Sequence, residues 1–452
     1  MASPVEQSRR TGPAADGGDR PRSRPRWIGG GVAVFAAVLL VAGCAVWGGW
    51  LDARGHHLHL GNAWPLSGHW EPRITRWAVA PVLVAAVWIA WGPRVAARAP
   101  WRRLTALVYL VAVAWPVALA SWDGPGALTA PLTTPYEYLH DVPRVTDLST
   151  FLATYNDHVM DPPRWTTHVS GHPPGMLGLL TVLDRIGLGG PEWAAAMCIG
   201  AGAFAAPAVL STVRVLSGEE TARRAAPFLP AAPAALWIAT SADAFFAGVA
   251  AAGVCALAHA AARTGARGDA WAVAGGLLLG GCLFLSYGLT LIGVLAVAVV
   301  VAQRRFRPLV VGGAVVVVLL LAAALAGFDW FTGLDLATQR VRAGRGWIER
   351  PEWYFWFANI AALAVAVGPA TVAGLAWLRR DRFAVLPGAV AVILAVALAS
   401  GLSVGETERI YLPFAVWLLP LAGLIPVRAA RFGLAAQAVT AIAVTGFLVL
   451  WW

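Results

Sequence analysis

The sequence predicts an all-α integral membrane protein that crosses the bilayer many times. Of its 452 residues, 58% are hydrophobic and only 13% are charged, whereas a soluble domain carries about a quarter charged residues. The apolar residues gather in runs long enough to cross roughly 30 Å of hydrocarbon. This composition excludes an ordinary soluble enzyme, a disordered protein and a secreted disulfide-rich domain.

The apolar runs predict about thirteen transmembrane helices, of which two short ones could instead be hairpins or re-entrant segments. The four cysteines also lie in apolar runs, without metal-like spacing, and are expected to behave as small buried hydrophobes. The predicted spans are 28–50, 77–92, 104–121, 195–215, 225–240, 242–262, 271–286, 288–303, 309–327, 355–378, 384–400, 410–426 and 433–452.

The charges predict which ends of the helices face the cytoplasm. All 34 basic residues are arginines. With the N-terminus inside, the predicted inner segments hold 23 arginines and 7 acidic residues, and the outer segments hold 11 arginines and 17 acidic residues. This asymmetry follows the positive-inside rule. It predicts a multi-pass cell-membrane protein with a cytoplasmic N-terminus, and the lack of a long basic stripe argues against nucleic-acid binding.

The chain divides into four predicted parts, with two long outer loops in the third. Long loops with structure of their own are usually functional. The parts are a disordered Arg-rich cytoplasmic tail (1–27), a two-helix membrane extension (28–103), a transmembrane core (104–426, with outer loops 122–194 and 328–354) and a C-terminal transmembrane helix (427–452). Helical patterns near 146–156 and 173–187 are expected to lie at the outer interface.

Three acidic residues of the first outer loop are candidate functional residues. Asp123 directly follows a predicted span on a Gly-Pro turn, where a carboxylate can deprotonate a hydroxyl, although an Asp at the start of a turn is also common. Glu137 and Asp141 lie in the segment Tyr-Glu-Tyr-Leu-His-Asp. Acids flanked by aromatic residues indicate a sugar or metal surface, or merely solvated side chains.

The segment His168-Val-Ser-Gly-His172-Pro173-Pro174-Gly is more specific. Pro173 and Pro174 suit the first turn of a following helix, so His172 is predicted at a helix N-terminus, where an anion such as a phosphate is favoured. The spacing of the two histidines would suit a metal on a helix, but the Ser-Gly between them and the prolines after them argue against one.

Later in the chain, charged residues again lie beside predicted spans. Asp243 is either a helix cap or a functional acid close to the hydrocarbon. The second outer loop carries Arg340, Arg342, Arg345 and Arg350. These arginines either hold a lipid phosphate or sugar rings, or anchor the protein at the interface.

The segment Glu408-Arg409-Ile-Tyr411-Leu-Pro joins two predicted spans. An arginine at this level can bind a phosphate through two parallel hydrogen bonds. The simpler interpretation is an Arg–Glu pair at the membrane surface, and the residues alone favour neither.

Together these residues resemble the GT-C superfamily of membrane glycosyltransferases, particularly dolichyl-phosphate-mannose–protein mannosyltransferases and the lipid A aminoarabinose transferase. The resemblance covers roughly residues 104–426. It depends on the order of four features: an acid after a span (Asp123), an outer loop ending in His172-Pro-Pro-Gly, Asp243 near the outer end of a helix, and the late Glu408-Arg409-x-Tyr411-x-Pro loop.

The resemblance implies a polyprenyl-phosphate sugar donor and transfer on the extracytoplasmic side. It maps the catalytic base onto Asp123. The adjacent second acid typical of the family is missing there, which leaves Glu137 and Asp141 as alternatives. Arg409 corresponds to the ligand of the lipid phosphate, and Glu408, Tyr411 and His172 are placed with it in the donor site.

The resemblance further implies direct displacement with inversion at the anomeric carbon. The acceptor would be a cell-envelope glycan, lipid or protein, a divalent metal is left open, and membrane lipids are the surrounding partners. The alternative from another class is a secondary transporter or lipid flippase. It would require matching interrupted helices in two halves of the chain, and no internal repeat is visible in the sequence.

Overall fold

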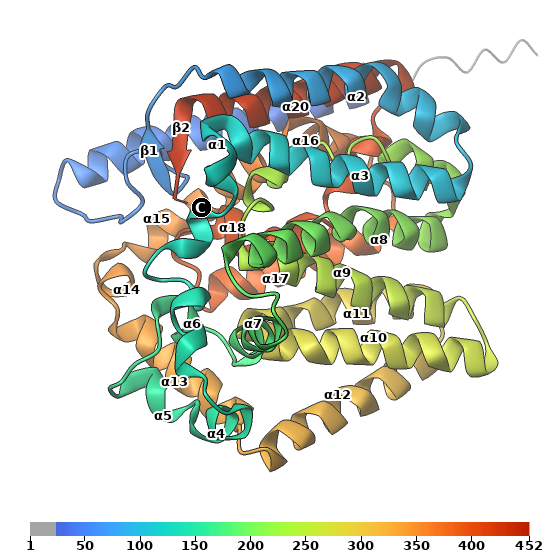
Figure 1. The fold of residues 1–452 in the computed structure, drawn as a ribbon. Coiled ribbons are helices and arrows are strands. Elements are labelled where there is room, and N and C mark those ends of the chain that lie inside the picture. Colours follow the sequence, from blue (N-terminus) through green and yellow to red (C-terminus); the bar gives the residue numbers. More distant parts are fainter. Residues whose placement is uncertain (1–23, 452) are drawn as a thin grey trace, which may run out of the picture.

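The computed structural model describes residues 24–451, which are helical almost throughout (Figure 1). The helices are α1 (Arg24–Asp52), α2 (Val79–Arg98), α3 (Trp101–Ala120), α4 (Leu148–Thr154), α5 (Asp157–Met160), α6 (Thr167–Ser170), α7 (Gly175–Arg185), α8 (Pro191–Ala225), α9 (Ala242–Ala261), α10 (Gly265–Leu285), α11 (Ile292–Ala302), α12 (Arg307–Leu325), α13 (Trp330–Ala343), α14 (Arg345–Glu349), α15 (Glu352–Val367), α16 (Pro369–Gly374), α17 (Val385–Ala399), α18 (Thr407–Ile410), α19 (Leu412–Ala415) and α20 (Ala430–Phe447). Two short strands, β1 (Gly68–Trp70) and β2 (Leu448–Leu450), pair antiparallel.

The prediction of an all-α protein with many membrane spans is confirmed, but thirteen spans are too many. Among residues 24–451, nine helices are long and apolar enough to cross a membrane. A tenth candidate consists of Glu352–Val367 and Pro369–Trp377, which meet at an angle of 98°. Most of the predicted tail, residues 1–27, lies outside the described residues.

Three predicted spans fail because apolar composition does not guarantee a continuous helix. The segment 225–240 is buried but consists of turns and the short 3₁₀ helix Pro233–Trp237. Proline lacks the backbone N–H that a helix interior requires, and this segment contains three prolines. For the same reason 410–426 is divided into α18, α19 and a 3₁₀ turn. The segment 288–303, which contains no proline, forms only the short apolar helix Tyr287–Ala302.

The predicted span 355–378 is broken at Gly368, which has φ +77° and precedes Pro369. A positive φ is readily adopted by glycine and ends the helix there. The side chain of Gln437 on α20 lies at this break, where its Oε1 accepts from the Ala370 N–H at 3.3 Å and its Nε2 donates to the Val367 carbonyl at 2.8 Å. These bonds satisfy backbone groups that the break leaves without helical partners.

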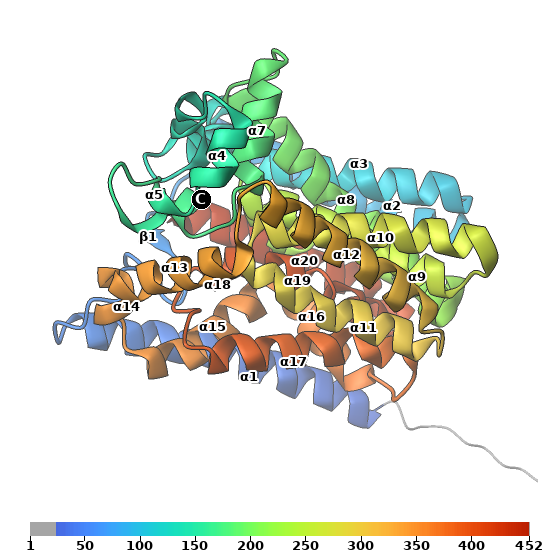
Figure 2. The same ribbon diagram turned by 90° about the horizontal axis from the view of Figure 1, so that it is seen from below.

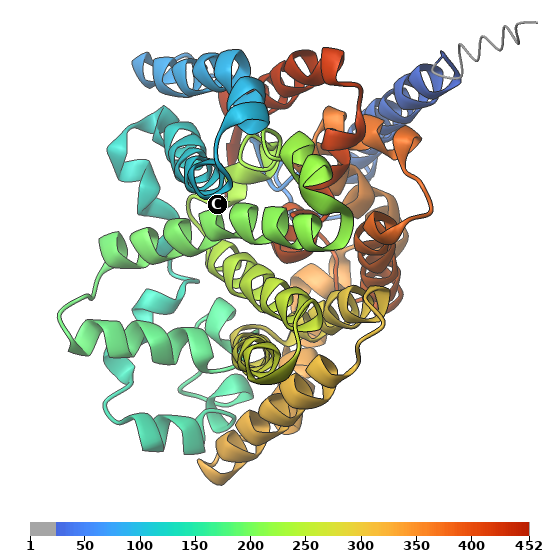
Figure 3. The ribbon, with the colours of Figure 1, turned by 90° about the vertical axis from the view of Figure 1, so that its right-hand side faces the viewer.

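The long helices run side by side, and nearly all the short elements gather at one end of the bundle, on the left of Figure 1. The view from below shows α4, α5 and α7 together above α13 and α14 at this same end (Figure 2). We call it the loop end. The two helical patterns predicted for the first outer loop appear as α4 and α7. Figure 3 looks onto the opposite end, where turns join the helices of the described chain.

Helices α8 and α9 cross so closely that one glycine is required between them. A Cβ atom on Gly248 of α9 would lie 1.9 Å from the backbone carbonyl oxygen of Ala201 on α8. We expect Gly248→Ala to lower the free energy of unfolding by about 1–3 kcal/mol, because the backbones would have to separate. Thermal unfolding in detergent checks this. Gly281→Ala is the matched control, since a Cβ there meets nothing within 4 Å; equal effects of both variants would contradict the prediction.

Candidate functional site

At the loop end, five ionisable side chains from four separate segments form one group, which we call the charge cluster. Arg409 Nη1 lies 2.9 Å from Asp243 Oδ2, and His168 Nδ1 lies 3.1 Å from Glu137 Oε1. The fifth member, His172, is half-buried and feels the charges of Asp243, His168 and Arg409. Glu137, Asp243 and Arg409 are each no more than 7% exposed.

Local sequence positions the Asp243–Arg409 pair. Asp243 lies in the first turn of α9, where Ser241 caps the helix by accepting from the Ala244 N–H at 3.3 Å. Arg409 lies on the single turn of α18, which follows Glu406 in the left-handed conformation with φ +59°. This bend brings Glu406 Oε2 to 3.5 Å from Arg409 Nη2. Arg409 therefore lies between two carboxylates.

The Glu137–His168 pair depends on the folding of the first outer loop. Asp141 binds Arg144 at 2.6 Å through one oxygen and accepts from the Thr166 N–H at 2.8 Å through the other. Both oxygens of this buried carboxylate are thus used to hold α6 against the segment that carries Glu137. We therefore interpret Asp141 as a residue that positions His168.

His172 is oriented by its own loop. Its Nδ1 lies 2.7 Å from the His168 carbonyl, which can only accept, so Nδ1 carries the proton and Nε2 is left as an acceptor in the neutral ring. The hydroxyl of Tyr155 donates to the carbonyls of Val169 and His172, at 2.6 and 2.7 Å, and so holds the segment that carries His172 in place.

The cluster keeps Glu137 and Arg409 ionised in spite of burial. Burial by itself raises the pKa of Glu137, but the hydrogen bond and charge of His168, with the charges of Arg409 and His172, outweigh it and hold this pKa below its usual value. Burial likewise favours neutral Arg409, yet Asp243, Glu406 and Glu137 raise the pKa of its guanidinium. An ionised carboxylate beside a fixed cation is suited to proton removal and anion binding.

Burial lowers the pKa of His172, and Asp243 opposes this only in part. The unfolded chain then takes up this proton first as the pH falls, so stability is full above the ordinary histidine pKa of about 6.5 and declines below it. We expect the melting temperature of His172→Gln to fall less between pH 7.5 and pH 5.5 than the melting temperature of the native protein. The exposed His57, changed to Gln, is the control. An unchanged loss in His172→Gln would contradict the assignment.

An arginine-lined cavity of about 500 Å³ adjoins the cluster on one side. We call it the arginine cavity. Its wall contains Glu406, and also Thr167 and Gly171, which are the chain neighbours of His168 and His172. Three arginines, Arg164, Arg340 and Arg350, line it as well.

The arginines of this cavity differ in their partners. Arg350 donates to the carbonyls of Leu58 and His59 at 2.9 and 2.8 Å and lies 3.7 Å from Glu406. Arg164 and Arg340 form no ion pair with a carboxylate anywhere in residues 24–451. Burial, and then the charge of Arg164, lower the pKa of Arg340. Two like charges held together in this way favour an anion between them.

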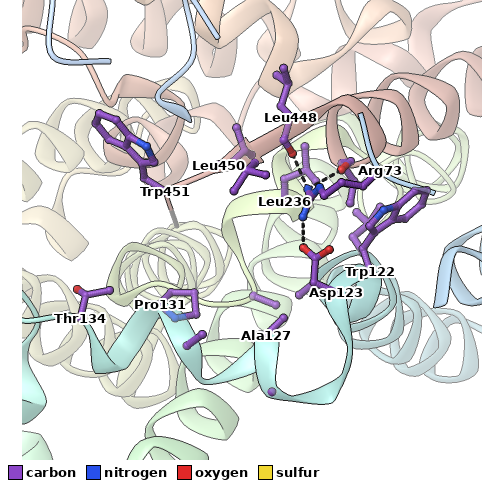
Figure 4. Close-up of a pocket in the computed structure, with 17 residues that line it drawn as sticks. Arg73, Trp122, Asp123, Ala127, Pro131, Thr134, Leu236, Leu448, Leu450 and Trp451 are labelled. Carbon is purple, nitrogen blue, oxygen red and sulfur yellow. Dashed lines mark hydrogen bonds and ion pairs between the residues drawn. The ribbon is translucent and has the colours of Figure 1, made fainter. Parts of the chain in front are cut away.

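A second cavity, of about 540 Å³, is also lined by residues close in the chain to members of the cluster (Figure 4). Its wall contains Thr134, whose carbonyl accepts from the Glu137 N–H at 3.1 Å, and Ala239, close in sequence to Asp243. Asp123 lies on the same wall, paired with Arg73. We call this the Asp123 cavity; Leu448, Leu450 and Trp451 close its far side.

Asp123 therefore lies outside the charge cluster. Arg73, its partner, is held by the carbonyls of Thr445 and Leu448 at 3.0 and 2.7 Å. The Asp123 carboxylate is 44% exposed. The structure brings together Glu137, His172, Asp243 and Arg409 and leaves Asp123 at the wall of the neighbouring cavity.

The remaining predicted residues support the site from outside. Glu408 points away from Arg409 and accepts from the Ser67 N–H at 2.8 Å; burial raises the pKa of this carboxyl. Tyr411 is buried, 1% exposed, at the end of α18. Pro173 and Pro174 lie just before α7 and not in its first turn. Pro174 is the N-cap, so His172 lies three residues before the helix begins.

Sequence reasoning placed neither Arg73 nor Arg164 in a site. It considered His168 only as a metal ligand. It also treated the four arginines of the second outer loop alike, whereas Arg340 and Arg350 line the cavity and Arg342 and Arg345 do not. Within the described residues no group of three or more His, Cys, Asp and Glu side chains is arranged to hold a metal ion.

Comparison with protein families and with curated protein sequences gives no match to this chain. Among solved structures, the chain is similar to the oligosaccharyltransferase of Archaeoglobus fulgidus, crystallised with Zn and sulfate, with a TM-score of 0.45 and 15% sequence identity. The match covers 76% of this chain and 53% of that one, so the chain spans about half the length of this neighbour.

Proposed function

We propose that this protein is a membrane glycosyltransferase of the GT-C type. It would transfer a sugar from a polyprenyl-phosphate donor to a hydroxyl of a cell-envelope acceptor on the extracytoplasmic side. The observation that carries the proposal is the buried charge cluster at the loop end of the helices, whose chain neighbours line two cavities. This part of the molecule would combine a base, a phosphate-binding cation and space for two substrates. We place it at the membrane surface, where the headgroup of a lipid donor meets water.

The arginine cavity suits the donor phosphate. Arg164 and Arg340 repel each other there without a carboxylate partner in the described chain, and an anion between them relieves that repulsion. Arg409 lies further in and shares Glu406 with the cavity wall. A phosphate that draws Arg409 away from Glu406 would couple donor binding to the charge cluster.

Glu137 is our choice for the catalytic base. It is ionised, buried and oriented by His168, and a base must be both charged and fixed to accept a proton in the transition state. The acceptor would approach from the Asp123 cavity, whose wall includes the backbone next to Glu137. In this arrangement Asp123 binds acceptor hydroxyls.

The proposed step is a single displacement. The acceptor hydroxyl gives its proton to the Glu137 carboxylate, and its oxygen forms the new bond to the anomeric carbon. The bond from that carbon to the phosphate oxygen breaks, and polyprenyl phosphate leaves with the electron pair and inversion of the anomeric centre. Arg409 stabilises the charge that develops on the leaving phosphate.

A transporter or lipid flippase is the second candidate. The observation that favours it is the sharp break between α15 and α16, because discontinuous helices often form the substrate sites of transporters. The break is occupied by Gln437 and lies away from the arginines of the cavity.

The deciding experiment uses the full chain in lipid nanodiscs, with a panel of radiolabelled polyprenyl-phosphate sugars and cell-envelope extract as the acceptor. Release of polyprenyl phosphate is measured with Mg²⁺ and with EDTA. Consumption of one donor supports the proposal and identifies the sugar, and the EDTA arm decides the metal requirement. If no donor is consumed but the protein moves the lipid across the bilayer of liposomes, the glycosyltransferase proposal is wrong and the second candidate function replaces it.

A further inference from the structure

A third cavity, of about 340 Å³, lies at the opposite end of the helices from the charge cluster. It is formed where the turn between α9 and α10 meets the turn between α11 and α12 (Figures 1 and 3). Its charged lining residues are Arg263, Arg305, Arg307 and Asp269. Three cations and one carboxylate leave two positive charges uncompensated.

Only one of these arginines is neutralised. Arg307 binds Asp269 through two parallel contacts of 2.7 Å. Arg263 is held by the ring of His259, 2.7 Å from its Nη1, and Arg305 reaches only the Arg263 carbonyl, at 3.4 Å. Neither Arg263 nor Arg305 has an acidic partner in the part of the chain that the structure describes. The cavity is therefore a prepared site for an anion.

The cavity lies at one end of a helix with an exposed apolar face. Helix α12, which forms one wall, is a peripheral helix, and only 11% of its membrane-length window is buried (Figure 2). It packs on α10 through a glycine seam in which a Cβ on Gly276 would lie 2.6 Å from the Gly312 carbonyl oxygen. Its outer face is apolar, with Val310 71% exposed and Leu321 59% exposed.

We infer that this cavity binds the headgroup of an anionic phospholipid whose acyl chain lies along α12. The phosphate would occupy the space between Arg263 and Arg305, while Arg307 is kept in place by Asp269. The exposed Phe306, beside these arginines, sits where an aromatic ring meets the acyl boundary. Basic pockets between helices at the membrane surface bind anionic headgroups in this way. The inference does not depend on the proposed function.

The test uses the delipidated full-length protein in detergent, titrated with phosphatidylglycerol or phosphatidylcholine and followed by native mass spectrometry. We expect phosphatidylglycerol to bind preferentially. Because each arginine near a membrane surface contributes about a fivefold gain in affinity for anionic lipid, the double variant Arg263→Gln/Arg305→Gln should bind it about twentyfold more weakly.

The matched control is Arg267→Gln, which removes the same charge from an exposed position in the first turn of α10, outside the cavity lining. It should bind phosphatidylglycerol within about twofold of the native protein. Equal losses in all variants would overturn the site and indicate diffuse attraction. Competition by millimolar inorganic phosphate alone would show a free-phosphate site and overturn the lipid assignment. The melting temperature of the double variant shows whether it is folded. If it is unfolded, the lipid affinity of the single variant Arg305→Gln is compared with that of the native protein.

Discussion

Glu137→Gln is expected to abolish sugar transfer while the protein stays folded. The amide keeps the size of the side chain but cannot accept a proton, and removal of a general base typically costs 10²–10⁴-fold in rate. Donor binding should change little, because the arginines of the cavity remain. Single-turnover release of polyprenyl phosphate, measured at saturating donor, gives the loss directly.

Two variants make this result specific. Asp161→Asn is the matched control, since Asp161 is an exposed carboxylate in the same loop, and it should transfer at the native rate. Asp123→Asn should raise the KM for the acceptor with a smaller fall in kcat, because it lies in the adjacent cavity. Full activity of Glu137→Gln together with a dead Asp123→Asn would move the base to Asp123.

Arg409→Gln is expected to be both inactive and strongly destabilised. Removal of one partner of a buried ion pair leaves the other charge uncompensated and costs about 3–5 kcal/mol. Asp243, only 7% exposed, would be that charge. The double variant Asp243→Asn/Arg409→Gln should regain much of the stability, because the buried Asp243 charge is removed and Glu406 keeps Arg350 at 3.7 Å. It should stay inactive because the phosphate ligand is gone.

Thermal unfolding of the single and double variants measures the coupling, and donor titration measures the phosphate contribution. Arg342→Gln is the control, an exposed arginine of the second outer loop that lies outside the cavity. If the double variant is as unstable as the sum of the two single variants, the pair is not coupled. If Arg409→Gln binds the donor normally, Arg409 is not a phosphate ligand.

Composition was sufficient to predict the class of fold but not the number of spans. Hydropathy measures the transfer of side chains out of water, and it is blind to whether the backbone can form a continuous helix. The segment 225–240 illustrates this, because its residues are buried as fully as those of α9 but its prolines prevent a helix. The broken helix at Gly368 has the same origin: the sequence contains Gly-Pro, but its apolar score hides the break.

The site was partly predictable because a charge beside hydrocarbon is conspicuous in an apolar chain. Asp243 and Arg409 were found in this way, Glu137 was found among acids flanked by aromatic residues, and His172 was found from the two prolines that follow it. The structure places the four together. Their pairing was not predictable, since Asp243 and Arg409 belong to segments far apart in the chain. Arg164 was missed because an exposed loop arginine indicates a binding site only when a second cation lies beside it. Its neighbour Arg340 is distant in the sequence.

The pairing of β1 with β2 has a consequence for the order in which the protein is made. Arg73 donates to the Leu448 carbonyl across a sequence separation of 375 positions, and Leu448 and Leu450 form a wall of the Asp123 cavity. Contacts between such distant segments form late, because the intervening chain must first be in place. During synthesis the Asp123 cavity therefore stays without one wall until the chain has been made as far as β2, which follows α20.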